Sequence, residues 1–141
     1  MDNERFFFTL AEDQAKMAKC PRASVGCVIV LGGEMILSTG FNGAPAGQVT
    51  CLDDGCIIEG GHCVRAVHAE VRAIALAAKR GIRLDGAEAY VTLLPCINCM
   101  NALIIAGVKM IYYDQSYERA EKDWLHQLAR SAHVRLIERT R

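Results

Sequence analysis

The sequence has no excess of charge of either sign, because 16 lysine and arginine residues balance 16 aspartate and glutamate residues. Proteins that grip duplex nucleic acid usually carry a basic excess, since contacts with phosphate dominate their affinity. The arginines from Arg130 to Arg141 form only a mild cluster, typical of a solvated tail. We therefore expect no nucleic-acid partner, whereas a small substrate with one phosphate is compatible with this balance.

Long apolar runs are also missing. The longest, Ala102 to Val108, is far shorter than the ~20 residues that cross a bilayer core. The opening Met-Asp-Asn-Glu-Arg carries acids where a signal peptide carries bases, so we expect a cytoplasmic protein without a membrane partner. The hydrophobic content of 52% excludes a disordered chain, and 141 residues suit a single domain over residues 1–141.

Cysteine, by contrast, is abundant, with seven residues. In a reducing compartment, clustered cysteines more often bind metal or take part in chemistry than form disulfides. The odd count also argues against a framework built only from disulfides. The cysteines are therefore the first candidates for metal-binding or catalytic residues.

Hydrophobic spacing predicts a helix over 4–19, a hairpin of two strands over 25–38 and a long loop over 40–63. Loops of that length inside compact domains are usually functional. Helices and strands then alternate, with helices over 67–79, 95–106 and 117–132 and strands over 87–94, 108–113 and 134–137. This alternation implies parallel strands joined by crossovers. The expected fold is a three-layer α/β/α domain with a five-stranded mixed sheet.

Three residues at the starts of predicted helices have the chemistry of a zinc site. Cys96 and Cys99 are three positions apart, so on a helix they share a face and can bind one ion. The first turn of a helix favours the thiolate form. Two thiolates and the imidazole of His68 suit Zn²⁺.

Three protein ligands leave the fourth tetrahedral position open, which is typical of catalytic rather than structural zinc. Zinc in such a site acidifies a bound water. Glu70 follows His68 by roughly 200° around an ideal helix, so it does not share the ligand line. It can instead approach the water and the substrate from the side, as a general acid and base does. His-x-Glu followed by Pro-Cys-x-x-Cys is the signature of zinc deaminases.

Further motifs resemble one family in particular. These are Cys20-Pro-Arg22 with Val-Gly, residues 40–47 (Gly-Phe-Asn-Gly-Ala-Pro-Ala-Gly), and Cys-Val-Arg before His68-Ala-Glu. Together they resemble deoxycytidylate (dCMP) deaminases, and most of all the bacterial branch that includes the late-competence-operon proteins. The resemblance covers about residues 5–117. Free cytidine deaminases have a cysteine where His68 stands, and tRNA adenosine and guanine deaminases lack the glycine-rich loop.

The resemblance implies hydrolytic deamination of dCMP to dUMP, with Glu70 moving protons between the attacking water, ring N3 and the departing amine. It also implies a set of substrate contacts. Asn42 would hold the sugar, and Tyr117 would lie near the phosphate. Arg22 and Arg65 are candidate phosphate partners, with surface solvation as the alternative. The substrate-binding set is completed by Ala69 of the His-Ala-Glu motif.

Some members of the family hold a second, structural zinc ahead of the catalytic helix. Four ligands drawn from five residues would close such a site and pin the long loop. The preferred set is Cys20, Cys51, His62 and Cys63, and Cys56 is the fifth candidate. Reduced, partly buried thiols are the alternative. Cys27, in the middle of a predicted strand, is expected to be a core residue.

One residue departs from the family pattern, which usually reads His-Ala-Glu-x-Asn-Ala-Ile. This chain has Arg72 in place of the asparagine, and its guanidinium could meet a phosphate or a neighbouring subunit. Another cytosine nucleotide or nucleoside, with or without a modified base, is therefore an alternative substrate. A zinc-stabilised regulatory protein without turnover is a further alternative, disfavoured by the intact Glu70. The resemblance also implies a homo-oligomer, either a hexamer or a dimer, with dCTP and dTTP as effectors.

Overall fold

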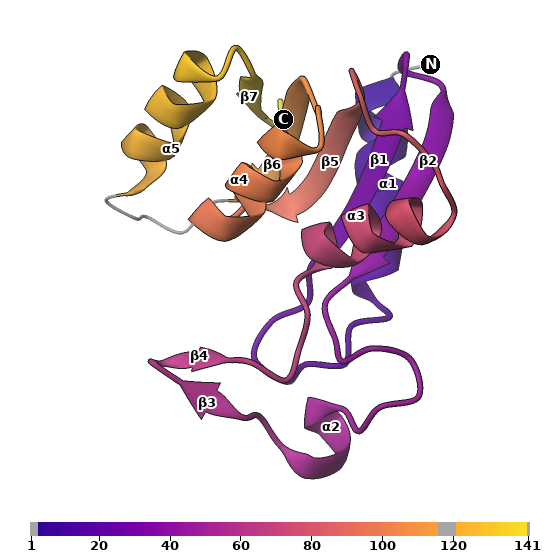
Figure 1. Cartoon of the computed structure of the whole chain (residues 1–141), viewed down its shortest axis with the longest axis vertical. Helices are drawn as coiled ribbons and strands as arrows, with labels where there is room; N and C mark the ends of the chain where they lie inside the picture. Colours follow the sequence, from indigo (N-terminus) through magenta and orange to yellow (C-terminus); the bar gives the residue numbers. More distant parts are fainter. Residues whose placement is uncertain (1–2, 116–120, 141) are drawn as a thin grey trace.

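The fold is built on a mixed sheet of five strands, ordered β2-β1-β5-β6-β7 (Figure 1). A computed structural model of the chain describes residues 3–115 and 121–140. The central β1 pairs antiparallel with both β2 and β5, whereas β5, β6 and β7 run parallel. The strands are β1 (Gly26–Leu31), β2 (Met35–Phe41), β5 (Glu88–Leu93), β6 (Met110–Gln115) and β7 (Arg135–Glu138).

Helices cover both faces of this sheet. They are α1 (Asn3–Ala15), α3 (Ala69–Lys79), α4 (Ile97–Ile105) and α5 (Glu121–Ser131). Helix α1 packs on one face, against β1 and β5, and α3 and α4 lie on the opposite face (Figure 1). Helix α5 shares the core of that second face through Leu125 and Ala129. The sequence-based prediction of a three-layer α/β/α fold is confirmed.

Alternation along β1 explains why two cores form. Val28 and Val30 pack with Phe7 and Phe8 of α1. Cys27 and Ile29 pack on the opposite face, under α3 and α4. Successive strand residues point to opposite faces, so a strand that is apolar throughout must be covered on both sides. Cys27 is fully buried, as expected for a core residue.

Two glycines let helices approach the sheet closely. A side chain at Gly26 would collide with the backbone of Ala11 in α1, and one at Gly40 would collide with the backbone of Ala69 in α3. Glycine is the residue that permits such backbone contact. Gly40 therefore allows the first turn of α3 to rest on the end of β2.

The long segment predicted as a loop over 40–63 contains short elements of its own. They are α2 (Cys51–Asp54), β3 (Ile58–Glu59) and β4 (His62–Cys63). Helix α2 begins at a capping box, in which Thr50 and Asp53 exchange side-chain to backbone hydrogen bonds. We call residues 48–63 the lower lobe, because they lie below the sheet in Figure 1.

The observed helices differ from the predicted ones by a few residues at their ends. The first helix stops at Ala15 rather than continuing to residue 19, and the third begins at Ala69 rather than at residue 67. The predicted start of the last helix, at residue 117, lies outside the described residues. Within the described part of the chain, no helix combines the length and apolar character needed to cross a membrane.

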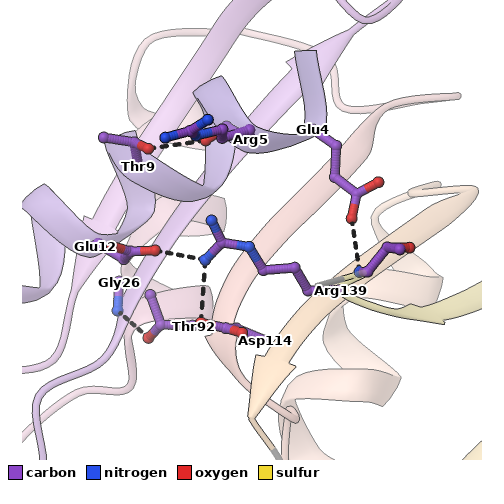
Figure 2. A network of polar contacts seen from close by, with 9 residues as sticks. Glu4, Arg5, Thr9, Glu12, Gly26, Thr92, Asp114 and Arg139 are labelled. Carbon is purple, nitrogen blue, oxygen red and sulfur yellow. Dashed lines mark hydrogen bonds and ion pairs between the residues drawn. The ribbon is translucent and has the colours of Figure 1, made fainter. Parts of the chain in front are cut away.

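A buried ion pair ties the end of the chain to its beginning. Arg139 contacts Glu12 of α1 at 2.6 Å and Asp114 of β6 at 3.3 Å, and its guanidinium lies 4.8 Å from the centre of the Phe8 ring. Figure 2 shows Arg139 between these two carboxylates. The backbone amide of Thr140 donates a hydrogen bond to Glu4 of α1. The Arg139 and Asp114 side chains are only 14% and 6% exposed, so water screens this pair poorly.

We expect Arg139→Gln to lower the free energy of unfolding by about 2 kcal/mol, because the buried Asp114 loses a cation. Urea denaturation measures the change. The control is Arg83→Gln, which breaks the exposed pair with Asp85 and should cost less than about 0.5 kcal/mol. Equal effects of the two substitutions would contradict this assignment.

Candidate active site

The candidate site lies at the edge of the sheet where β2 and β5 end and β1 begins. Because β1 is antiparallel to both neighbours, Gly26 at its start pairs with Phe41 at the end of β2, and Cys27 pairs with Val91 of β5. The chain after β2, the chain after β5 and the chain before β1 therefore converge. Ligands of α/β proteins usually bind beyond the carboxyl ends of such strands.

Two helices begin at this edge, and each begins at a metal-binding side chain. His68 is the N-cap of α3, and Cys96, directly after Pro95, is the N-cap of α4. Neither side chain makes the hydrogen bond to the helix that a capping side chain normally makes, so both remain available to an ion. Two positive helix ends meet here and favour anionic ligands.

The ligand atoms of His68, Cys96 and Cys99 all lie within 4.8 Å of one another. The Nδ1 atom of His68 is 3.3 Å from Sγ of Cys99 and 3.6 Å from Sγ of Cys96. A tetrahedral zinc with bonds of ~2.0 Å to nitrogen and ~2.3 Å to sulfur separates such ligands by about 3.5 Å. The geometry and the donor set of these three residues both fit Zn²⁺.

The charges of the three ligands are those that a cation needs. Hydrogen bonds from the Cys99 thiol and then from His68 lower the pKa of Cys96 to about 3. The pKa of Cys99 is raised, because it shares a hydrogen bond with Cys96 and is buried. The hydrogen bond to Cys96 raises the pKa of His68. One thiolate is therefore preformed, and zinc binding would release the proton of the second.

Glu70 lies in a pocket of about 330 Å³ together with His68 and Cys96. Its side chain is 4% exposed, and burial raises the pKa of its carboxyl group. A carboxyl group with a raised pKa can both accept and return a proton near neutral pH. The volume falls at the small end of the range typical of small-molecule sites.

The structure also places the other predicted substrate residues. Asn42, Ala69 and Arg22 line the same pocket. Arg65 does not line it, because its guanidinium bonds the carbonyl oxygen of Val49 and lies near the Asp54 carboxylate. Tyr117 lies outside the described residues.

A second group of cysteines gathers in the lower lobe. Cys51, Cys56 and Cys63 have their sulfur atoms within 4.8 Å of one another, and Sγ of Cys51 is 3.5 Å from Sγ of Cys63. Backbone hydrogen bonds from Ala66 and from a neighbouring amide lower the pKa of Cys63 to about 6, whereas burial raises the pKa of Cys51 to about 12. Cys56 is only the fifth candidate by sequence, although its spacing to Cys51 and Cys63 is a signal for a shared site.

Three members of the preferred set, Cys20, His62 and Cys63, line the active-site pocket. Cys20 is also close enough to Cys56 for its charge to raise the pKa of that thiol. The seven cysteines of the chain are all free of disulfides. The lower lobe therefore forms one wall of the pocket while holding a cluster of thiols of its own.

Comparisons with known proteins agree with this geometry. A family model described as the cytidine and deoxycytidylate deaminase zinc-binding region matches residues 1–115. The chain belongs to this deaminase family. Its relatives include ComE operon protein 2 of Bacillus subtilis (strain 168), 44% identical over 114 residues, a match that covers 81% of this chain and 60% of that protein. The recognition of this family from sequence motifs is confirmed.

Two further members of the deaminase family, both from phages, match at lower identity. The deoxycytidylate deaminase of Enterobacteria phage T2 is 34% identical over 76% of this chain and 77% of its own length. The crystal structure of dCMP deaminase from the cyanophage S-TIM5, in complex with dCMP and dUMP, matches with a TM-score of 0.81 at 28% identity, over 96% of each chain. The match to the Bacillus protein, by contrast, spans less than two thirds of that protein.

We expect Cys96→Ala to lose the zinc held at this site, because one of three protein ligands is gone and the preformed thiolate with it. Atomic emission or mass spectrometric metal analysis of the purified protein gives the zinc content per chain. Cys27→Ala is the matched control, since it removes a buried thiol from the core and should leave the content unchanged. Retention of all zinc by Cys96→Ala would contradict the assignment.

Proposed function

We propose that this protein catalyses the hydrolytic deamination of dCMP to dUMP and ammonia. The observation that carries this proposal is the single pocket in which an open three-ligand site lies beside the buried Glu70. The phage T2 relative is named a deoxycytidylate deaminase, and the S-TIM5 enzyme was solved with dCMP and dUMP. We propose that residues 1–141 act as one domain and that the protein is cytoplasmic.

The residues of the pocket divide the reaction between them. Zinc held by His68, Cys96 and Cys99 would lower the pKa of a water and so supply a nucleophile at neutral pH. Glu70 takes a proton from the attacking water and delivers it to ring N3 as oxygen adds at C4. Glu70 then carries the second proton to the departing amine, so that one water is consumed and one ammonia released.

Substrate recognition is proposed for the residues around this centre. Asn42 and Ala69 line the pocket and would face the sugar and the base, and the exposed Arg22 at its rim would meet the phosphate. Arg65 would reach a phosphate only by leaving Val49 and Asp54. Tyr117 stays a phosphate contact predicted from sequence alone.

We further propose a second, structural zinc in the lower lobe, held by Cys51, Cys56 and Cys63. Sulfur ligands of tetrahedral zinc lie about 3.8 Å apart, close to the 3.5 Å between Cys51 and Cys63. Cys20 is the proposed fourth ligand, because it lines the same pocket as Cys63 and its charge contributes to the raised pKa of Cys56. Reduced thiols without metal are the alternative.

Cys56→Ser tests this second site. It should lower the zinc content from two equivalents to one and loosen the lower lobe, because a segment with few buried apolar residues loses its cross-link. Metal analysis and hydrogen exchange over residues 48–63 measure the two effects. A wild-type content of one zinc per chain would overturn the proposal.

Oligomerisation and regulation are proposals as well. Ile105 on α4 is 86% exposed, and Val71 and Leu76 on α3 are 38% and 37% exposed. We propose a homo-oligomer, a dimer or a hexamer, that covers some of these apolar side chains. The proposed effectors are dCTP and dTTP. A different cytosine nucleotide or nucleoside is the alternative substrate, and a zinc-stabilised regulatory protein is the alternative without turnover.

We expect Glu70→Gln to reduce ammonia release from dCMP by at least about a thousandfold, because the amide keeps the shape of the side chain but cannot move protons. The assay measures ammonia from dCMP, CMP, dCTP, deoxycytidine and 5-methyl-dCMP, with the zinc content of both proteins checked. Turnover highest on another compound would favour the alternative substrate. Absence of turnover on all of them in zinc-loaded wild-type protein would overturn the enzyme assignment.

A further inference from the structure

Arg72, on the second turn of α3, directs its guanidinium at the backbone that follows β2. Its Nε donates to the carbonyl oxygen of Phe41 at 2.8 Å. Its Nη2 donates to the carbonyl oxygens of Gly43 and Ala44 at 2.9 and 2.7 Å. The guanidinium carbon also lies 4.3 Å from the centre of the Phe41 ring. One half-buried cation therefore holds a short segment, residues 41–44, which we call the Asn42 loop.

The Asn42 loop supports a wall of the active-site pocket. The Asn42 side chain accepts a hydrogen bond from the amide of Val25 at 2.7 Å and donates one to the carbonyl oxygen of Ala23 at 2.9 Å. Asn42, Ala23 and Val25 all line the pocket that contains Glu70. A shift of the Asn42 loop would therefore move two segments of the pocket wall together.

The same loop is tied to the residue that precedes the zinc ligand His68. Gly43 and Val67 exchange two backbone hydrogen bonds, at 3.0 and 2.9 Å. The carbonyl oxygen of Gly43 accepts from both the Val67 amide and Arg72, which uses both of its lone pairs. Arg72 thus links α3 to the Asn42 loop, and the Asn42 loop is linked in turn to Val67, just before the start of α3.

The geometry of this contact suits a guanidinium. Arg72 donates from two nitrogen atoms, Nε and Nη2, held in one rigid plane, whereas the three N–H donors of lysine radiate from a single nitrogen at the end of a flexible chain. The absence of a side chain at Gly40 brings α3 and the end of β2 together, so that the reach is short. Hydrogen bonds to a charged donor are stronger than neutral ones, so their loss should loosen the loop measurably.

We propose that Arg72 is a positioning residue, which holds the Asn42 loop against the helix of His68 and Glu70 so that the sugar end of the pocket is preformed. The proposal rests on the proposed function for its consequence, since a preformed pocket lowers the KM for a pyrimidine nucleotide. The contacts themselves do not depend on that function. In this structure the guanidinium bonds three carbonyl oxygens of the chain's own backbone.

The test compares Arg72→Gln and Arg72→Lys with the wild-type holoenzyme. We expect the KM for dCMP to rise roughly tenfold or more in Arg72→Gln, with kcat within a few-fold of wild type and the zinc content unchanged. Arg72→Lys should fall between the two. In Arg72→Ala, millimolar methylguanidinium should restore part of the lost affinity, since it can refill the space and the hydrogen bonds.

A second readout needs no turnover. Hydrogen exchange at the amides of Val25, Gly43 and Val67 should quicken in Arg72→Gln and slow again when methylguanidinium is added to Arg72→Ala. Arg139→Gln is the control for a lost buried arginine elsewhere, and it should lower stability without changing the KM or the exchange at these amides. If wild-type protein deaminates no cytosine compound, the proposed function fails while the exchange data still decide the role of Arg72.

Two results would overturn the proposal. Wild-type KM and exchange in Arg72→Gln would show that the contacts hold nothing in place. A loss of kcat and zinc at unchanged KM would show that Arg72 supports α3 itself rather than the Asn42 loop.

Discussion

The whole site depends on the meeting of two helix starts at one edge of the sheet. His68 is the N-cap of α3, and Cys96 is the N-cap of α4. Both lie at the edge of the sheet where β2 and β5 end on either side of β1. The positive ends of both helices face the same small volume, which lowers the cost of gathering thiolates and a buried carboxyl group there. Gly40 brings α3 against β2, and residues 26–30 of β1 are buried between two helical layers.

Two segments that lie outside the helix and sheet layers, the lower lobe and the Asn42 loop, surround this centre. The lower lobe forms part of the pocket wall and contains a cluster of three thiols. The Asn42 loop is held by Arg72 and by the pair between Gly43 and Val67. This loop is therefore fixed from two sides, by α3 and by the residue that precedes His68.

Much of the fold and the centre of the site could be predicted from the sequence. The spacing of Cys96 and Cys99 on a helix start, and the placement of His68 and Glu70 on another, specify a ligand set without knowledge of the sheet. Apolar runs such as that of β1 indicate burial on both faces. These features are local, because each involves only a few residues that are close together in the sequence.

The rest depends on contacts between distant residues. Arg139 meets Glu12 across most of the chain, and nothing in the local sequence marks that pair. Arg72 binds carbonyl oxygens, which every residue carries, so no side-chain pattern announces its partners. In the lower lobe four candidate ligands lie close in sequence, and only the folded loop shows that Cys56 joins Cys51 and Cys63 in one cluster that does not include His62.

The central claim is an open zinc site made by two sulfur ligands and one nitrogen ligand. Zinc-edge X-ray absorption of a variant with Cys56→Ser and Cys63→Ser, which removes the lower-lobe cluster, measures the coordination of the remaining zinc directly. The account predicts two sulfur ligands at ~2.3 Å and lighter ligands near ~2.0 Å, one of them an imidazole nitrogen. A shell of four sulfur atoms, or no bound zinc at all in the folded variant, would contradict it.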